Sequence, residues 1–166
     1  MLAKTGIPAQ EDIRKVMPTQ ERLYKGPAAI IECFQNIPCN PCYTACNRNA
    51  IKEFVDINDL PNINHEECNG CGLCISKCPG LAIMVVDMTY SEGEALLKIP
   101  YEFLPLPKEE STVKGLDREG NYICDVRVVK VMNSKALDKT PIISIAVNKE
   151  HIMTVRNIGM GDHHGR

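Results

Sequence analysis

The chain has 166 residues, which is enough for one ordinary domain or two small ones. Its formal net charge of −2 gives no electrostatic reason to expect binding to nucleic acid or to a membrane surface. No apolar run reaches the roughly 18 residues of a membrane span, and the first residues lack the apolar run of a signal peptide. We therefore expect a cytoplasmic protein.

The first 28 residues predict a helical arm. The stretch QEDIRKV has helical spacing, and Pro18 ends this helix soon after Val16 because proline cannot donate a backbone hydrogen bond. The stretch QERLYK predicts a second short helix, which can end at Gly26 with Pro27 just beyond it. The stretch AAIIECF then predicts a strand that leads into cysteine-rich sequence.

Eight of the nine cysteines lie between residues 33 and 78, in two groups of four. A disulfide framework is typical of secreted proteins, whereas clustered cysteines in a cytosolic protein indicate metal thiolates. The ninth, Cys124, lies in a β-rich stretch, and we expect it to be a small core residue.

The two cysteine-rich stretches, 30–51 and 62–83, are copies of one another offset by thirty-two residues. The offset superimposes three pairs of cysteines: Cys39 on Cys71, Cys42 on Cys74 and Cys46 on Cys78. Each copy predicts a strand, a cysteine loop, a short helical turn and a second strand, with the second strands at 54–57 and 85–88. The duplication indicates two pseudosymmetric halves that share one core.

The remainder of the chain predicts β structure. The stretches ALLKIPYEF, STVKGLD, YICDVRVVKVM and TPIISIAV have strand length and strand composition, and Gly120 marks a hairpin turn. Four or five strands in this length favour a small antiparallel barrel or sandwich. We divide the chain into an arm at 1–28, a cysteine-rich domain at 29–88, a β domain at 89–158 and a flexible tail at 159–166.

The second cysteine group, Cys68-x2-Cys71-x2-Cys74-x3-Cys78 followed by Pro79, indicates an iron–sulfur cluster. Three thiolates at this spacing can surround one cubane, and Gly70 and Gly72 allow backbone N–H groups to approach the sulfurs. Zinc sites usually have two cysteine pairs separated by a longer stretch, which fits this spacing poorly. Attachment of haem needs C-x-x-C-H, and radical enzymes that use S-adenosylmethionine need C-x3-C-x2-C; neither pattern occurs.

In two-cluster ferredoxins the fourth cysteine of each group binds the other cluster. Cluster 2 would then use Cys46, Cys68, Cys71 and Cys74. Cluster 1 would use Cys39, Cys42 and Cys78 and needs one more ligand, because Asn36 occupies the position that the repeat assigns to a cysteine. Cys33, three residues earlier, is a softer donor than an amide and is our candidate.

The alternative is that Cys33 is a buried strand thiol, so that cluster 1 has three irons or one open iron. We expect the aromatic residues Phe34 and Tyr43 to shield the clusters from water. We expect His65 to be a surface loop residue; the alternative is that it tunes the nearby cluster by hydrogen bonding.

Residues 29–88 resemble the bacterial-type two-cluster 4Fe–4S ferredoxin domain. The second motif matches completely, whereas the first departs at Asn36 and at Asn47, which replaces the usual proline. The resemblance implies an α+β chain with two 4Fe–4S clusters in a pseudosymmetric ferredoxin domain, followed by the small antiparallel β barrel or sandwich.

Over the whole chain, the stretches IIECFQNIPCNPCYTAC and DKTPIISIAVNKEHIMTVRNI resemble the small iron–sulfur subunits of multi-subunit, FAD-dependent dehydrogenases of anaerobes. This resemblance implies a hetero-oligomer with flavin subunits that oxidise amino acids, imino acids or opines, and with a small 2Fe–2S protein.

The sequence contains no phosphate-binding glycine loop and no Ser/His/Asp set, so nothing in it indicates substrate chemistry. The leading interpretation is a non-catalytic electron-transfer subunit that relays single electrons from the flavin of a partner dehydrogenase to an acceptor. The alternatives are a freely diffusing ferredoxin-like carrier and an enzyme whose open iron acts as a Lewis acid.

Overall fold

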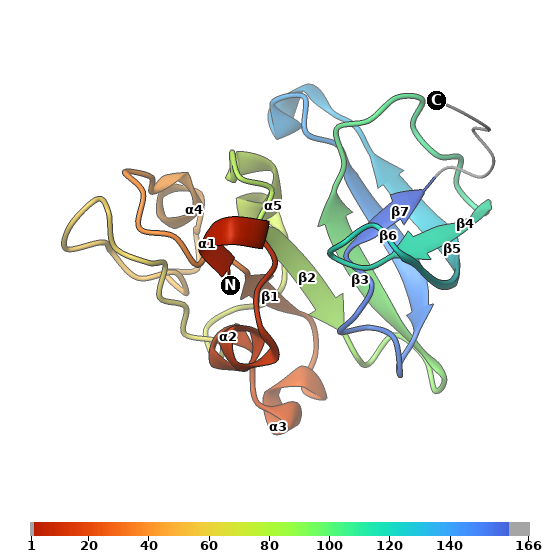
Figure 1. Ribbon diagram of the computed structural model, residues 1–166, viewed down its shortest axis with the longest axis horizontal. Helices are drawn as coiled ribbons and strands as arrows, with labels where there is room; N and C mark the ends of the chain where they lie inside the picture. Colours follow the sequence, from red (N-terminus) through yellow and green to blue (C-terminus); the bar gives the residue numbers. More distant parts are fainter. Residues whose placement is uncertain (1, 160–166) are drawn as a thin grey trace.

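The computed structural model describes residues 2–159 (Figure 1). Its helices are short: α1 (Leu2–Thr5), α2 (Gln10–Val16), α3 (Gln20–Leu23), α4 (Pro41–Thr44), α5 (Leu73–Lys77) and the 3₁₀ helix η1 (Lys135–Leu137). Its strands are β1 (Ala28–Ile31), β2 (Ile83–Asp87), β3 (Glu94–Pro100), β4 (Thr112–Leu116), β5 (Tyr122–Met132), β6 (Ile142–Asn148) and β7 (Asn157–Gly159). Within residues 2–159, no helix has both the length and the apolar composition needed to cross a membrane.

All seven strands belong to one antiparallel sheet with the order β1-β2-β3-β6-β5-β4-β7. The sheet is not closed into a barrel, which corrects the expected separate barrel or sandwich. Within residues 2–159 the edge strands β1 and β7 do not pair with each other, so the sheet stays open. The sheet is continuous with the cysteine-rich region because β2 pairs with β1 on one side and with β3 on the other. In Figure 1, β1 and β2 lie beside the short helices, and β3 to β7 lie together in the other half of the molecule.

The N-terminal arm folds largely as the sequence predicts. Helix α2 ends at Val16, two residues before Pro18, and α3 begins after Thr19, whose hydroxyl accepts a hydrogen bond from the Arg22 N–H at 3.2 Å. Each helix buries one apolar side chain, Ile13 in α2 and Leu23 in α3. Helix α1 was not expected from the sequence. The predicted tail at 159–166 lies outside the described residues except for Gly159, which ends β7.

The backbone pairing at the ends of the two copies follows the thirty-two-residue offset. Ile31 pairs with Ile83 between β1 and β2, and Ile51 pairs with Ile63 in an isolated antiparallel bridge. Two hydrogen bonds of 2.8 Å are related by the same offset: Glu32 N–H to Ala82 O and Asn64 N–H to Ala50 O. The start of each copy therefore pairs with the end of the other.

The strand expected at 54–57 is wrong. Val55 is fully exposed and the segment is a turn, in which the Asp56 carboxylate accepts hydrogen bonds from the backbone and the side chain of Asn58 at 2.8 and 2.7 Å. Short polar side chains that bond to the nearby backbone in this way compete with strand pairing.

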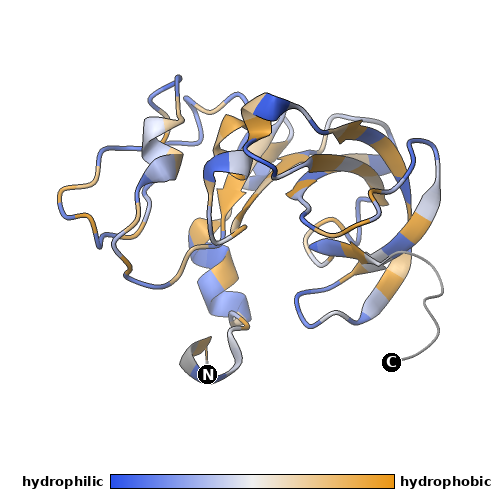
Figure 2. Cartoon of the chain, turned by 90° about the horizontal axis from the view of Figure 1, so that it is seen from above, coloured by the Kyte–Doolittle hydropathy of each residue, from blue (hydrophilic) through white to orange (hydrophobic). Residues whose placement is uncertain are grey.

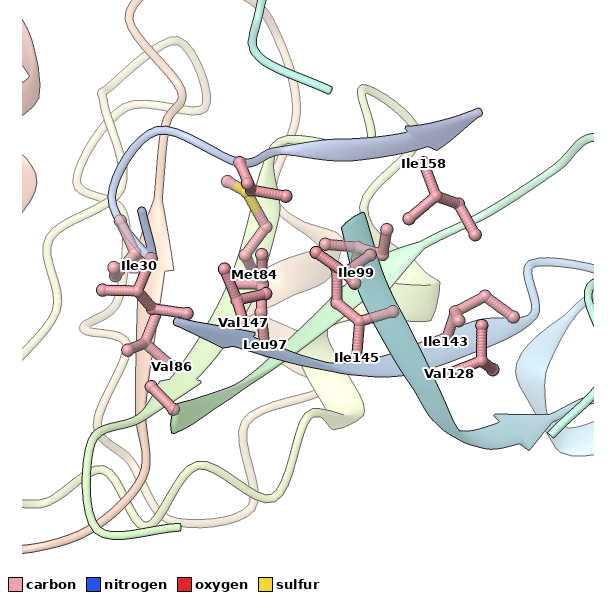
Figure 3. Close-up of a cluster of buried hydrophobic side chains, with 14 of the residues drawn as sticks. Ile30, Met84, Val86, Leu97, Ile99, Val128, Ile143, Ile145, Val147 and Ile158 are labelled. Atoms are coloured by element: carbon pink, nitrogen blue, oxygen red, sulfur yellow. The ribbon is translucent and has the colours of Figure 1, made fainter. Parts of the chain in front are cut away.

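The two faces of the sheet bury different cores. One face carries aliphatic side chains from β1, β2, β3, β5 and β6 that point toward one another (Figure 3). The opposite face of β1 and β2 packs against α5 and contributes to a second core, which contains Ile75, Val85 and several of the cysteines. Figure 2 shows hydrophobic residues concentrated along the strands and polar residues along most of the connecting loops. The first strands of the sheet thus form the floor of the cysteine-rich region.

Candidate iron–sulfur site

The eight clustered cysteines divide between two cavities. Cavity 2 has a volume of about 330 Å³, including the space open to solvent at its mouth. Its lining includes all four cysteines that the sequence assigns to cluster 2: Cys46, Cys68, Cys71 and Cys74. Three of them come from the second group, and Cys46 follows α4 of the first group.

Cavity 1 has a volume of about 370 Å³ on the same basis. Its lining includes all four cysteines that the sequence assigns to cluster 1: Cys33, Cys39, Cys42 and Cys78. Cys42 lies in α4, and Cys78, from the second group, directly follows α5. Each cysteine group therefore supplies one thiol to the cavity of the other, which is the arrangement that the sequence spacing predicts.

The displaced cysteine lies in cavity 1, whereas the asparagine does not line it. Cys33 follows β1 by two residues and reaches the cavity beside Cys78. Asn36 is exposed, and its side-chain amide donates a hydrogen bond to the carbonyl of Asn58 at 2.9 Å. The geometry thus places the Cys33 thiol with the other three thiols. Its role as the fourth ligand stays a prediction.

Burial, together with the charges of neighbouring thiols, raises the pKa of three of the cavity thiols, Cys33, Cys42 and Cys74. Burial, followed by the charges of Cys68, Cys71 and Cys46, raises the pKa of Cys74 to about 12. Burial also raises the pKa of Cys42 to about 11. A cationic iron core offsets the cost of burying a negatively charged sulfur. Cysteine thiols therefore lose their protons when they bind the metal as thiolates. The donor set is therefore chemically suited to a 4Fe–4S cluster in each cavity.

Backbone N–H groups already point at three of the sulfurs. The donor–sulfur distances are 3.4–3.5 Å for Ala29 and Gly70 to Cys68, Ile51 to Cys46 and Ala82 to Cys78. Hydrogen bonds of this kind stabilise negative charge on sulfur and influence the reduction potential of a cluster.

The loop between Cys68 and Cys71 depends on glycine. Gly70 has φ +63°, and a Cβ at this position would lie 2.5 Å from the Cβ of Pro27. Gly72, with φ +85°, caps the start of α5. The sequence predicted close approach of the backbone here, and the structure shows that the N-terminal arm is what lies against Gly70.

Arg22 is a residue near the site that the sequence analysis missed. Its side chain is buried and donates to backbone carbonyls of His65 and Cys68, which lie more than forty residues away in the chain. No sequence signal distinguishes Arg22 from the other charged residues of the arm. Its role follows only from the docking of α3 onto the cysteine loop.

The remaining candidates have mixed outcomes. His65 is half-buried rather than a surface residue, and burial lowers the pKa of His65. The ring of Tyr43 lies 6.5 Å from the ring of Phe54, which lines cavity 1, whereas Phe34 lines a separate cleft. Cys124 packs against the aliphatic core of the sheet and lines neither cavity.

Residues 61–84 match the family described as 4Fe-4S binding domain. The chain is 36% identical over 58 residues to the ferredoxin-type protein NapF of Haemophilus influenzae, covering 34% of this chain and 33% of NapF. It is 38% identical over 50 residues to the pyruvate synthase subunit PorD of Methanocaldococcus jannaschii, covering 30% of this chain and 56% of PorD. The chain thus spans about a third of the length of NapF. No solved structure matches.

These matches show that the chain contains a ferredoxin-type 4Fe–4S binding domain. The family match covers the second cysteine group but ends before β3. Among residues 2–159, no three His, Cys, Asp or Glu side chains are arranged to hold a single metal ion.

Proposed function

We propose that this chain is an electron-transfer subunit that holds two 4Fe–4S clusters and relays single electrons from the flavin of a partner dehydrogenase to an acceptor. Cluster 1 is bound in cavity 1 by Cys33, Cys39, Cys42 and Cys78, and cluster 2 in cavity 2 by Cys46, Cys68, Cys71 and Cys74. The observation that carries the proposal is that each cavity is lined by four cysteines drawn from both groups.

The count of two clusters is supported by the geometry of the first group, which the family match does not reach. Cavity 1 has nearly the volume of cavity 2 and the same number of thiols. The backbone pairings at the ends of the two copies are also related by the same thirty-two-residue offset. Both observations support a pseudosymmetric two-cluster domain.

The protein contributes binding, spacing and partial exclusion of water. The clusters, when bound, supply the one-electron chemistry. Cys46 and Cys78 each tie one cysteine group to the cavity of the other, so they hold the two cavities close together. The buried aliphatic side chains Ile51 and Ile83 line cavity 2 and cavity 1 respectively and cover the clusters on the side of the protein core.

The identity of the partner is supported by sequence resemblance. We propose a cytoplasmic hetero-oligomer with FAD-containing dehydrogenase subunits for amino acids, imino acids or opines, and with a small 2Fe–2S protein. The chain carries an arm and five strands beyond its two cysteine groups, which a simple diffusing carrier does not need. Exposed Phe103 and Leu104, between β3 and β4, offer apolar surface for a fixed contact.

The position of Cys33 supports a relay over the Lewis-acid alternative, because a fourth thiol in cavity 1 leaves no iron open to substrate. The test is iron and acid-labile sulfide analysis with low-temperature EPR on anaerobically purified protein. We expect about eight irons and eight sulfides in the wild type. Cys33→Ser should show a three-iron signal, while Cys124→Ser, the matched control outside both cavities, should not.

A wild type with about four irons would refute the two-cluster proposal. A wild type with about seven irons, unaltered by Cys33→Ser, would instead favour the open-iron enzyme. The partner is tested separately by identifying the proteins that co-purify with the chain and by asking whether their flavin reduces its clusters.

A further inference from the structure

We propose that Arg22 and Lys98 raise the reduction potential of cluster 2 above that of cluster 1. A single electron transferred to the protein then resides mainly on cluster 2. This inference rests on the proposed two-cluster function. It assigns both cations a positioning role: they contact the backbone of the loop that carries Cys68, and they act on the cluster through their charge.

Arg22 holds the cysteine loop against the N-terminal arm. Arg22 is only 6% exposed. Within the described part of the chain, each hydrogen bond from its guanidinium goes to a backbone carbonyl. The acceptors are His65 at 2.6 Å, Gly26 and Pro27 at 3.0 Å each, and Cys68. These contacts fix a full positive charge beside the residue whose thiol lines cavity 2.

The charge of Arg22 is not neutralised by a carboxylate. Within residues 2–159, Arg22 forms no ion pair. The partly buried arginines Arg118 and Arg156 differ because both donate to the carboxylate of Glu32. A buried cation without a counterion is costly, and a nearby anionic cluster would compensate it.

Lys98 places a second cation on the same loop from another part of the chain. It lies on β3, outside the cysteine-rich region, and its Nζ donates to the carbonyl of Gly70 at 3.2 Å. It is partly buried and also forms no ion pair among the described residues. The arm and the β-rich part of the chain therefore each direct one positive charge toward cavity 2.

The residues that line the cavities differ in the same sense. Among the described residues, Arg48 lines cavity 2 and no acidic residue does. Asp59 lines cavity 1, and no basic residue from the described part of the chain does. Glu32 and its two arginines, Arg118 and Arg156, line a separate cleft and not cavity 1.

The consequence for the potentials follows from Coulomb's law. Reduction adds one negative charge to a cluster, and a nearby buried cation stabilises that charge more strongly than a solvated one would. Three cations around cavity 2, against one carboxylate lining cavity 1, favour reduction of cluster 2. The loop carbonyls hold Arg22 and Lys98 in place in both oxidation states.

The test is an EPR-monitored redox titration of the full-length protein with Arg22→Gln, Arg22→Lys and Lys98→Met. Cys33→Ser alters the signal of cluster 1 and so identifies it. We expect Arg22→Gln to reduce the equilibrium constant for reduction of cluster 2 about tenfold, which is about 59 mV for one electron, and to leave cluster 1 unchanged. Arg22→Lys should recover most of this loss, and Lys98→Met should shift the potential in the same direction.

Lys15→Gln is the control. This substitution removes one positive charge from the same arm, but at an exposed position where the lysine pairs with Asp12. Its potentials should equal those of the wild type. If Arg22→Gln fails to bind cluster 2, the potential of Lys98→Met tests the inference instead. This variant loses only one hydrogen bond to the loop, so we expect it to keep the cluster. The inference is overturned if both clusters assemble and neither cation variant changes the difference between their potentials. A wild type with one cluster would instead refute the proposed function, a result that iron analysis gives before any titration.

Discussion

The thiols of Cys33 and Cys78 come from opposite cysteine groups and lie in one cavity, close enough that the charge of Cys78 raises the pKa of Cys33 in addition to the effect of burial. Cys33 reaches this position from the end of β1, and Cys78 from the end of α5. Because β1 pairs with β2, which begins five residues after Cys78, the sheet itself brings the two thiols together. The displaced cysteine thus has a structural explanation: the start of the first copy is anchored by the end of the second.

A cysteine restored to its repeat position will not replace Cys33. In the double variant Cys33→Ser/Asn36→Cys, position 36 faces Asn58 and lies outside the lining of cavity 1. We therefore expect the same three-iron EPR signal as in Cys33→Ser alone. Full recovery of about eight irons in the double variant would show that the loop rearranges freely, and would contradict the placement of Cys33 as the fixed donor.

The sequence predicted the grouping of the cysteines because that grouping depends on local spacing. The short intervals from Cys68 to Cys74 aim three thiols at one point, and the two-cluster pattern transfers Cys46 and Cys78 to the opposite cavities. The end of α2 could also be predicted from nearby residues, because Pro18 ends the helix. These features need no knowledge of the tertiary structure.

What the sequence did not predict depends on long-range contacts. The pairing of β2 with β3 makes one sheet from two expected domains, and neither strand carries a signal for it. Strand β7 has three residues, too few for an alternating pattern. Arg22 finds its acceptors in a loop distant in sequence. The predicted strand at 54–57 failed because its apolar pattern was outweighed by the turn around Asp56.

Gly70→Ala should destabilise the protein and impair binding of cluster 2. The added Cβ meets the Cβ of Pro27 at 2.5 Å, in a backbone conformation that already disfavours alanine. We expect a loss on the order of 3 kcal/mol in the free energy of unfolding, with fewer irons in the purified protein. Denaturant titration and iron analysis measure the two effects.

Gly120→Ala is the matched comparison, because Gly120 also has positive φ but no atom lies within 4 Å of the added Cβ. It should cost about 1 kcal/mol and leave the iron content unchanged. Equal losses in the two variants would mean that backbone strain, and not contact with the arm, explains the glycine at position 70.

Glu32→Gln should destabilise the fold strongly. The buried carboxylate accepts hydrogen bonds from Arg118 at 2.8 and 2.6 Å and from Arg156 at 2.8 Å. Burial raises the pKa of Glu32, but the two guanidinium groups outweigh this effect and hold it below its ordinary value. The amide leaves two buried cations without a counterion, which costs about 3 kcal/mol or more.

The comparison for this variant is Glu94→Gln, which removes a carboxylate that pairs with Arg127 at 3.5 Å on the surface. An exposed pair of this kind contributes about 1 kcal/mol or less. Urea unfolding of both variants tests the difference. A loss in Glu32→Gln no larger than in Glu94→Gln would show that solvent reaches the Glu32 cluster and screens it.

A fragment that ends at residue 88 should not fold as an independent two-cluster domain. The boundary predicted from the sequence falls in the turn between β2 and β3, and these strands are paired. Removing β3 and β6 uncovers Ile30, Met84 and Val86, which pack against the aliphatic side chains of the strands beyond residue 88. It also removes Lys98 from the cysteine loop.

We expect the 1–88 fragment to aggregate or to bind substantially less iron than the full chain, because an exposed apolar strand edge promotes association. Sedimentation velocity and iron analysis under anaerobic conditions measure both properties. A monomeric fragment with about eight irons would support the boundary predicted from the sequence. It would also mean that the continuous sheet joins two units that are each stable alone. A fragment that recovers its clusters only when residues 89–159 are added in trans would support the structure, since β3 could then pair with β2 without a covalent link.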